Sequence, residues 1–306
     1  TEVCCAPAGT LPLGGLHHLL YFPSVDSVRR FRERVAPTGD LREGRPTLRL
    51  ESRELLVLAL EQDDGIELAP AHVFNPWYSA LGTVSGKRTL AEIFGELTPR
   101  VLAAEMGLTS IPAMCRRVSA LDRHALFCCS DAHSLPNVGR ECTLLDIEPS
   151  FTALCAALRD GSRRHLRGWV KFPVERARYF HNWCGVCQRG AFAVRCPECG
   201  RPLVAGSRDR LAAIADRSVP AVSADEPPCQ QLLPLAYLLA ELMAVDRKSK
   251  SVARMHVRLL EALGHERHIL TEATEEEIAN ASTREFVGMT VGGVGARSGL
   301  ASGMNS

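Results

Sequence analysis

The stretch ALFCCSDAH (residues 125–133) joins an apolar run to two side chains that can bind metal. The run Ala-Leu-Phe-Cys-Cys is long enough for a buried strand. Asp131 and His133 follow it, and residues i and i+2 of extended backbone point the same way. Such a pair suits zinc, manganese or iron. Taken alone it is weak evidence, because a histidine after an apolar run more often has a structural role.

Two other segments share this design. LHHLL (residues 16–20) contains His17 and His18, and APAH (residues 69–72) ends at His72. In a β/α barrel the carboxyl ends of the strands converge on one face. Together with Glu2 upstream, we expect these segments to supply the ligands of a cluster of divalent ions. Such ions activate water for attack on a phosphoryl group.

The first half of the chain alternates strand and helix patterns, which predicts an α/β fold with a largely parallel sheet or barrel. The expected strands are residues 16–22, 65–74 and 121–130. Four helices are expected. The first is capped by Ser24 and has Val25, Val28, Phe31 and Val35 facing inward, and the second spans residues 53–62 with Ser52 as its cap. The third is short and follows the Thr89–Glu92 capping-box pair, and the fourth runs from Ser150 to Asp160 with Gly161 beyond it.

Composition excludes several classes of protein. With 306 residues, 46% of them hydrophobic and 23% charged, the chain reads as a globular protein of two or three domains. A net charge of +1 excludes a global basic field, so contacts with DNA must come from local patches. No segment resembles a membrane span or a signal peptide. Twelve cysteines in a long chain without an export signal favour metal binding in the cytoplasm.

The clearest local motif is a pair of CxxC turns. Cys184 and Cys187 form one turn, and Cys196 and Cys199 form the other. Four thiolates at this spacing predict one structural zinc ion with no open position for a substrate. A pair of disulfides and an iron site are the alternatives. We expect the other cysteines to be ordinary thiols.

Three regions have the composition of a DNA contact. Arg163, Arg164, Arg167, Lys171, Arg176 and Arg178 surround Trp169, Phe172, Tyr179 and Phe180, although a solvated arginine-rich face is equally consistent with composition alone. Trp77 and Tyr78 follow His72 and would wedge into a duplex or pack at the barrel rim. Lys248 and Lys250, with Arg247, Arg254 and Arg258, lie among two helices expected over residues 231–245 and 251–263. That helical region is either a helix–hairpin–helix-like grip on phosphate or a packing module.

Long segments of the chain resemble the endonuclease Q branch of the PHP phosphoesterase superfamily. They are PAHVFNPWYSALGTVSG (70–86), EMGLTSIPAM (105–114) and RRVSALDRHALFCCSDAHS (116–134), supported by HHLLYFPS (17–24) and GRPTLRLESRELL (44–56). The resemblance runs from about residue 1 to 216 and less clearly to 281. It implies a distorted seven-stranded β/α barrel with two or three metal ions. It also implies cleavage of DNA on the 5′ side of uracil, hypoxanthine, xanthine or an abasic site.

Carried over by position, the resemblance makes Glu2 the bridging glutamate and His18, in preference to His17, the next ligand. His72, Asp131 and His133 complete the set of catalytic metal ligands, for zinc, manganese or magnesium. The family begins with an HxH motif that has no counterpart here, and residues 4–15 differ from its usual charged hairpin. We therefore expect a truncated copy of an active enzyme, lacking the first barrel strands and at least two ligands, or else a degenerate product.

The expected organisation is a partial PHP-like domain (1–160), a basic segment with the zinc module (161–217), a helical DNA-binding region (218–287) and a flexible tail (288–306). The predicted protein is a cytoplasmic, metal-dependent DNA repair endonuclease with DNA as its partner and no membrane contact. The sequence identifies no further repair or replication factor. The alternatives are a PHP phosphatase acting on a small phosphoester, against which the zinc module and basic region argue, and a non-catalytic DNA-binding remnant.

Overall fold

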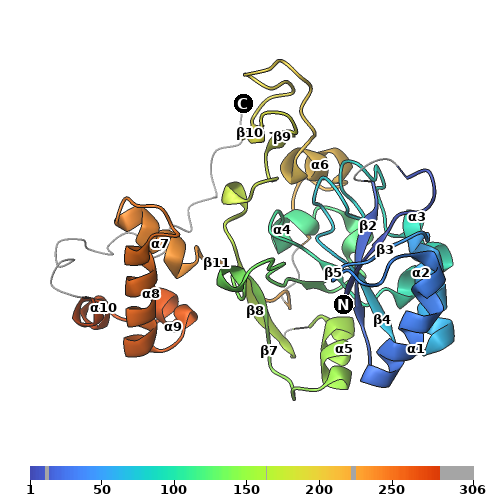
Figure 1. Cartoon of the computed structure of the whole chain (residues 1–306), viewed down its shortest axis with the longest axis horizontal. Helices are drawn as coiled ribbons and strands as arrows, with labels where there is room; N and C mark the ends of the chain where they lie inside the picture. The colour runs from blue at the N-terminus through green and yellow to red at the C-terminus, as the bar shows by residue number, and fades with distance from the viewer. Residues whose placement is uncertain (11–13, 163, 222–224, 283–306) are drawn as a thin grey trace. The chain divides into compact units, whose positions relative to one another are not determined.

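The computed structural model describes residues 1–10, 14–162, 164–221 and 225–282. The chain divides into two compact units, Thr1–Gln231 and Leu232–Ser306 (Figure 1). The tail predicted to be flexible, residues 288–306, and Arg163 lie outside the described residues. No helix in the described part of the chain is long and apolar enough to cross a membrane.

The sheet that carries the predicted ligands contains β1 (Glu2–Cys5), β2 (Leu16–Tyr21), β3 (Thr47–Leu48) and β4 (Glu67–Pro70), in the order β3-β1-β2-β4. β2 is antiparallel to β1 and to β4, and β3 is parallel to β1. The expectation of a largely parallel sheet is therefore wrong here. Residues 6–15 are too short for the crossover that parallel neighbours need, so β2 returns beside β1 in the opposite direction.

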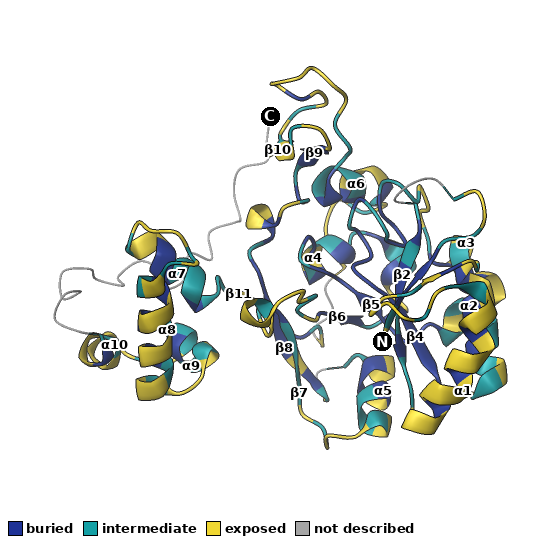
Figure 2. Cartoon of the chain, in the orientation of Figure 1, coloured by how far each residue is buried: buried dark blue, intermediate teal, exposed yellow. Residues whose placement is uncertain are grey.

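Helices α1 (Val25–Val35) and α2 (Ser52–Gln62) supply the apolar partners of one face of this sheet. Strand residues and helix residues share one core cluster, which includes Val3, Leu20, Leu68, Phe31, Val35, Leu55, Leu56 and Ala59. Figure 2 shows the buried sheet beside helices whose outer sides are exposed. Removing apolar surface from water in this core stabilises the folded state by about 25 cal/mol for each Å².

The capping predictions for these two helices have different outcomes. Ser24 caps α1 as predicted, since its side chain accepts a hydrogen bond from the Ser27 N–H. Val25 and Val28, which we expected to face inward, are 67% and 38% exposed. Ser52 does not cap α2, because Glu51 occupies the N-cap and forms a capping box with Glu54. Ser52 is instead the first residue of the helix and is buried.

The other face of the sheet packs against a second apolar cluster. It contains Ala69, Leu102, Ala103, Phe127, Cys155 and Leu158, contributed in part by β4, β6 (Leu126–Phe127) and α5 (Phe151–Asp160). β6 pairs in parallel with β5 (Ala104–Glu105), and the Leu102 N–H donates to the Leu68 carbonyl at 2.8 Å. The α5 prediction is confirmed: Ser150 caps the helix and Gly161 ends it in the left-handed conformation, with φ of 63°.

A third sheet has the order β11-β8-β7, from β7 (Cys142–Leu145), β8 (Leu166–Lys171) and β11 (Cys229–Gln231). Trp169 Nε1 donates to the Leu126 carbonyl at 3.1 Å, which ties β8 to β6. The remaining regular elements of this unit are α3 (Ala91–Phe94), α4 (Pro112–Cys115), α6 (Ser207–Ile214), β9 (Asn182–Cys184), β10 (Arg189–Ala191) and the 3-10 turns η1 (Ala36–Thr38), η2 (Gly95–Arg100), η3 (Ser119–Leu121), η4 (Leu135–Asn137) and η5 (Val174–Arg176). The Thr89–Glu92 bonds expected before α3 are present.

The second unit is helical. It contains α7 (Leu235–Leu242), α8 (Lys250–Leu263), α9 (Glu266–Thr271) and α10 (Glu275–Ala281), packed around Leu235, Leu239, Val252, Leu259 and Ile269. The two predicted helices are confirmed as α7 and α8, and Gly264 ends α8 with φ of 87°. α9 and α10 are not in the sequence prediction, because each is short and buries a single residue, Ile269 or Ala281.

Candidate active site

Three side chains that can bind metal meet at the sheet of β1, β2 and β4. Glu2 comes from β1, His17 from β2, and His72 lies two residues beyond the end of β4. His17 Nδ1 lies 2.9 Å from Glu2 Oε1 and 3.3 Å from His72 Nε2, while His72 Nε2 lies 3.8 Å from Glu2 Oε1. One donor atom from each residue therefore falls within 4.8 Å of the other two, a spacing that a shared cation allows.

Strand alternation explains why His17, and not His18, joins this group. In antiparallel β1 and β2, Cys4 is opposite His17 and Glu2 is opposite Leu19, so Glu2 and His17 share one face. His18 faces the opposite side, where its Nε2 lies 2.7 Å from Ser52 Oγ and burial lowers its pKa to about 3. His17, the less favoured choice, therefore lies beside Glu2 and His72, whereas His18, which the resemblance favoured, does not.

The electrostatics of the group favour a charged Glu2 beside two imidazoles. Burial acts to raise the pKa of Glu2, but His17 and His72 outweigh it and hold that pKa well below its usual range. Burial lowers the pKa of His17, and the Glu2 carboxylate opposes this effect. His72 behaves differently: burial acts to lower its pKa, but Glu2, Glu105 and Asp131 together raise it. An ionised carboxylate between two imidazoles is a donor set that suits zinc or manganese.

A cavity of about 470 Å³ opens beside this group. Its lining residues include four of the five predicted metal ligands, Glu2, His72, Asp131 and His133. Asp131 and His133 do not lie within the close triad. His133 is 69% exposed at its side chain, and its Nδ1 lies 3.8 Å from Asp131 Oδ1. Asp131 has a φ of 43°, and Arg140 donates to its carbonyl at 3.1 Å, which fixes the loop beside the cavity.

Sequence reasoning gave no role to Glu105, which holds His72 in place. Glu105 is fully buried, and its carboxylate accepts hydrogen bonds from the His72 N–H and from the Gly107 N–H, the latter at 2.8 Å. His72 has a φ of 32°, an unfavourable value for a residue with a Cβ. Burial raises the pKa of Glu105 despite the charges of His72 and Lys171. No spacing in EMGLTSIPAM marks this residue, since its partners are backbone amides.

Position 107, next to this network, has no room for a side chain. It has a φ of +65°, and a Cβ built on it would lie 2.5 Å from His72 Cβ and 2.9 Å from His72 Cα. A side chain at this position would therefore collide with the backbone and Cβ of His72, and only glycine fits.

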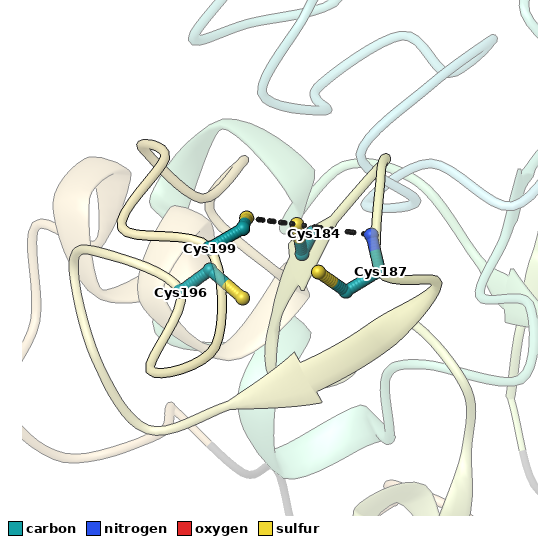
Figure 3. Close-up of side chains that lie close together, drawn as sticks. All are labelled: Cys184, Cys187, Cys196 and Cys199. Atoms are coloured by element: carbon teal, nitrogen blue, oxygen red, sulfur yellow. Dashed lines mark hydrogen bonds between the residues drawn. The ribbon is translucent and has the colours of Figure 1, made fainter.

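The four cysteines of the CxxC pairs converge as predicted (Figure 3). Cys184 Sγ lies 3.6 Å from Cys199 Sγ, and the Cys187 N–H donates to Cys184 Sγ at 3.3 Å. Sulfurs around a tetrahedral zinc ion with bonds of ~2.3 Å stand roughly 3.8 Å apart, so the residues fit this ion. The amide of Cys187 is the main cause of a lowered pKa of Cys184, about 7, which favours the thiolate. At 3.6 Å the sulfurs of Cys184 and Cys199 are not joined by a disulfide, so the arrangement favours a metal site over the disulfide alternative.

The aromatic residues predicted to touch DNA connect the metal cluster to the zinc module. The Tyr78 ring stacks on the His17 ring with centroids 4.7 Å apart. The Trp77 ring meets the Tyr179 ring edge-on at 4.9 Å, and Tyr179 meets Trp183 at 5.1 Å. Trp77 and Tyr78 therefore both pack against other aromatic rings at the rim of the site, which is one of the two roles predicted for them.

The basic residues divide into exposed and buried ones. Arg164, Arg167, Lys248 and Lys250 are exposed, and Arg167 pairs with Asp146. Lys171 has 0% side-chain exposure; its ammonium lies 2.6 Å from Glu141 Oε2 and also donates to the Gly107 carbonyl. The predicted contact between Lys171 and DNA is therefore wrong, because an ammonium enclosed under the site cannot reach a phosphate. Its position at the end of β8 gave no sign of this burial.

No family model matches the chain. The Bacillus subtilis protein YqxK, itself uncharacterised, is 27% identical over 276 residues, covering 87% of this chain and 66% of YqxK. The lesion-specific endonuclease PfuEndoQ from Pyrococcus furiosus has a solved structure that is similar with a TM-score of 0.74 and 29% identity over 87% of this chain. A second endonuclease Q structure, in complex with a 27-mer duplex carrying an abasic lesion at the active site, gives a TM-score of 0.78 and 28% identity.

Over 87% of its length the chain is therefore similar to endonuclease Q in both fold and sequence. The chain spans just under two thirds of YqxK, and 67% and 68% of the two endonuclease Q structures. The family resemblance found in the sequence is confirmed, together with a mixed α/β fold, a Cys4 cluster and carboxy-terminal helices.

Proposed function

We propose that the chain carries the metal-binding core of a DNA repair endonuclease. The supporting observation is the meeting of Glu2, His17 and His72 in a cavity that Asp131 and His133 also line, in a chain with the fold of endonuclease Q. The proposed reaction is hydrolysis of the phosphodiester on the 5′ side of a deaminated base (uracil, hypoxanthine or xanthine) or an abasic site. It leaves a 3′-hydroxyl and a 5′-phosphate.

The residues fit a divalent metal ion. Glu2 Oε1 is buried and has His17 Nδ1 at 2.9 Å but makes no hydrogen bond of regular geometry, and His72 Nδ1 is a buried atom with no hydrogen-bond partner among the described residues. Glu2, His17 and His72 would hold zinc, manganese or magnesium, and Asp131 and His133 would add ligands from the cavity wall. Such an ion lowers the pKa of water and neutralises charge on a phosphoryl oxygen. The protein supplies the orientation: Tyr78 stacks on His17, and Glu105 fixes the backbone of His72.

The DNA contact is proposed for exposed cations of each unit and for the half-buried aromatics Trp77 and Tyr78. Trp77 and Tyr78 lie between the cluster and the zinc module, where they would meet an extruded nucleotide. Arg164 and Arg167 in the first unit, and Lys248 and Lys250 in the helical unit, would hold phosphates. A structural zinc ion at the Cys4 cluster would fix the module.

The domain assignment follows the same proposal. Residues 1–160 would be part of a PHP-type distorted (β/α)7 barrel, residues 161–217 the basic zinc segment, and residues 218–287 a helix–hairpin–helix-like region. Because chromosomal DNA is the proposed substrate and free thiolates need a reducing environment, we place the protein in the cytoplasm.

The test is a nicking assay with the full chain on duplexes carrying one abasic site, uracil or hypoxanthine, each with manganese, magnesium or zinc. Glu2→Gln removes the charge between the imidazoles and should abolish nicking, whereas Glu148→Gln, an exposed acid, should leave it unchanged. Absence of nicking on every duplex with every metal would refute the proposal. Hydrolysis of a chromogenic phosphomonoester without any nicking would favour a small-substrate phosphatase instead.

A further inference from the structure

The cavity beside the metal cluster presents a charge problem for a phosphate. Its lining residues include the carboxylates of Glu2, Glu105 and Asp131, which repel a phosphodiester anion. Among the lining residues, Arg45 is the only lysine or arginine. Even with the cluster loaded with cations, the non-bridging oxygens of a phosphate need donors of fixed geometry. Arg45 is the guanidinium available at that wall.

Arg45 is held in place by the strand that carries Glu2. The Cys4 N–H donates to the carbonyl of Pro46, the residue after Arg45, at 2.9 Å. Thr47 then pairs with Cys4 in the parallel β1–β3 ladder. Proline also restricts the backbone of the residue before it. The base of the Arg45 side chain is therefore fixed relative to Glu2, while the side chain itself remains 40% exposed.

The contact of Arg45 with Glu2 leaves most of the guanidinium free. Its Nη1 lies 3.4 Å from Glu2 Oε2, a single long contact and not a bidentate pair. Within the described part of the chain, the Arg45 side chain makes no hydrogen bond other than this one. Meanwhile Glu2 turns Oε1 toward His17. A guanidinium has five N–H donors in a planar fork that matches two phosphate oxygens, so it can bind an anion while it stays beside Glu2.

We propose that Arg45 binds the non-bridging oxygens of the DNA phosphate that enters this cavity. The inference rests on the proposed function and gives it a residue that contacts the substrate. In this arrangement the Glu2 carboxylate separates two tasks: Oε1 faces the imidazoles that hold the cation, and Oε2 orients the guanidinium that holds the anion. A partly exposed ion pair of this kind contributes little to stability, so little is lost when the guanidinium also binds a phosphate.

The test compares Arg45→Met and Arg45→Lys with Arg42→Met. Arg42 is an exposed arginine on the same segment that pairs with Asp40 and does not line the cavity, which makes it the matched control. The measurements are binding to an abasic-site duplex at several salt concentrations, single-turnover nicking, and uptake of Mn²⁺ followed by loss of the free-ion EPR signal.

Arg45→Met should lower the nicking rate by ~10²- to 10³-fold, the range seen when one donor to a transition-state oxyanion is removed. The slope of log binding constant against log salt should become shallower by about 0.9, the value for one lost phosphate contact. Arg45→Lys should keep the slope and recover part of the rate, since lysine retains the charge but not the fork. Arg42→Met should match the unaltered protein, and Mn²⁺ uptake should be the same in all four proteins.

An unchanged salt slope in Arg45→Met would overturn the inference, as would a loss of Mn²⁺ uptake equal to its loss of nicking, because Arg45 would then act only through Glu2. If the unaltered chain binds the duplex but never nicks it, the proposed function fails, while the salt slopes still decide the role of Arg45. If the chain does not bind the duplex at all, both are overturned.

Discussion

Replacing Gly107 with alanine should damage the site far more than the fold. A Cβ at this position would lie 2.5 Å from His72 Cβ, whereas carbon atoms in contact normally stand ~3.5–4.0 Å apart, so His72 or Gly107 must move by about 1 Å. A misplacement of about 1 Å can cost ~10²-fold in rate. We expect Gly107→Ala to lower single-turnover nicking of an abasic-site duplex by about that factor.

Gly86 provides the matched control for the backbone. It has a φ of +68°, against +65° for Gly107, but nothing lies within 4 Å of an added Cβ. Gly86→Ala should cost only the left-handed backbone penalty, about 1–2 kcal/mol of unfolding free energy. Gly107→Ala should lose that amount and roughly 1–3 kcal/mol more from the collision. Urea unfolding measures both variants.

The comparison isolates the contact with His72 because the two glycines share their backbone conformation. If Gly107→Ala nicks DNA within threefold of Gly86→Ala, then the position of His72 does not control the reaction. Equal unfolding free energies for the two variants would show that the collision is relieved without cost, which would also refute the reasoning.

Three further predictions concern single side chains. Glu105→Gln removes one of two acceptors facing the amides of His72 and Gly107 and should weaken Mn²⁺ binding by about 10- to 100-fold, as for other groups that orient a metal ligand; an EPR titration equal to that of the unaltered protein would contradict this role. His17→Asn should abolish Mn²⁺ uptake, whereas His18→Asn should leave it intact and lower the unfolding temperature; the reverse result would restore His18 as the ligand. Cys184→Ser should reduce the zinc content by one equivalent, measured by atomic emission, without changing Mn²⁺ uptake; an unchanged zinc content would exclude the Cys4 site.

Local signals in the sequence predicted the elements that depend on local chemistry. The cap at Ser24, the glycine after α5 and the four-cysteine module follow from bonds between residues close in sequence. The family resemblance came from long motifs, which are far more specific than any single histidine.

The sequence could not predict features that depend on contacts between distant segments. His17 and His18 are both buried, so exposure does not reveal which one faces Glu2; the register of β1 against β2 decides it. The composition around Lys171 predicts a surface cation, because its partner, Glu141, lies on a different segment and no local pattern reveals it. Glu105 was not recognised because its role is to accept backbone N–H groups, which leave no trace in residue type.

The direction of the strands was also outside the reach of local patterns. Alternating strand and helix signals favour a parallel sheet, but β2 is antiparallel to both neighbours. The segment between β1 and β2 is too short for a helical crossover, and this constraint outweighs the general pattern.

The most direct test of the central claim is anomalous diffraction from crystals soaked in Mn²⁺. The account predicts a peak within bonding distance of Glu2 Oε1, a His17 ring nitrogen and a His72 ring nitrogen, and its loss in His17→Asn crystals. A saturated crystal with no anomalous density at this position, while the histidines keep the arrangement described above, would contradict it.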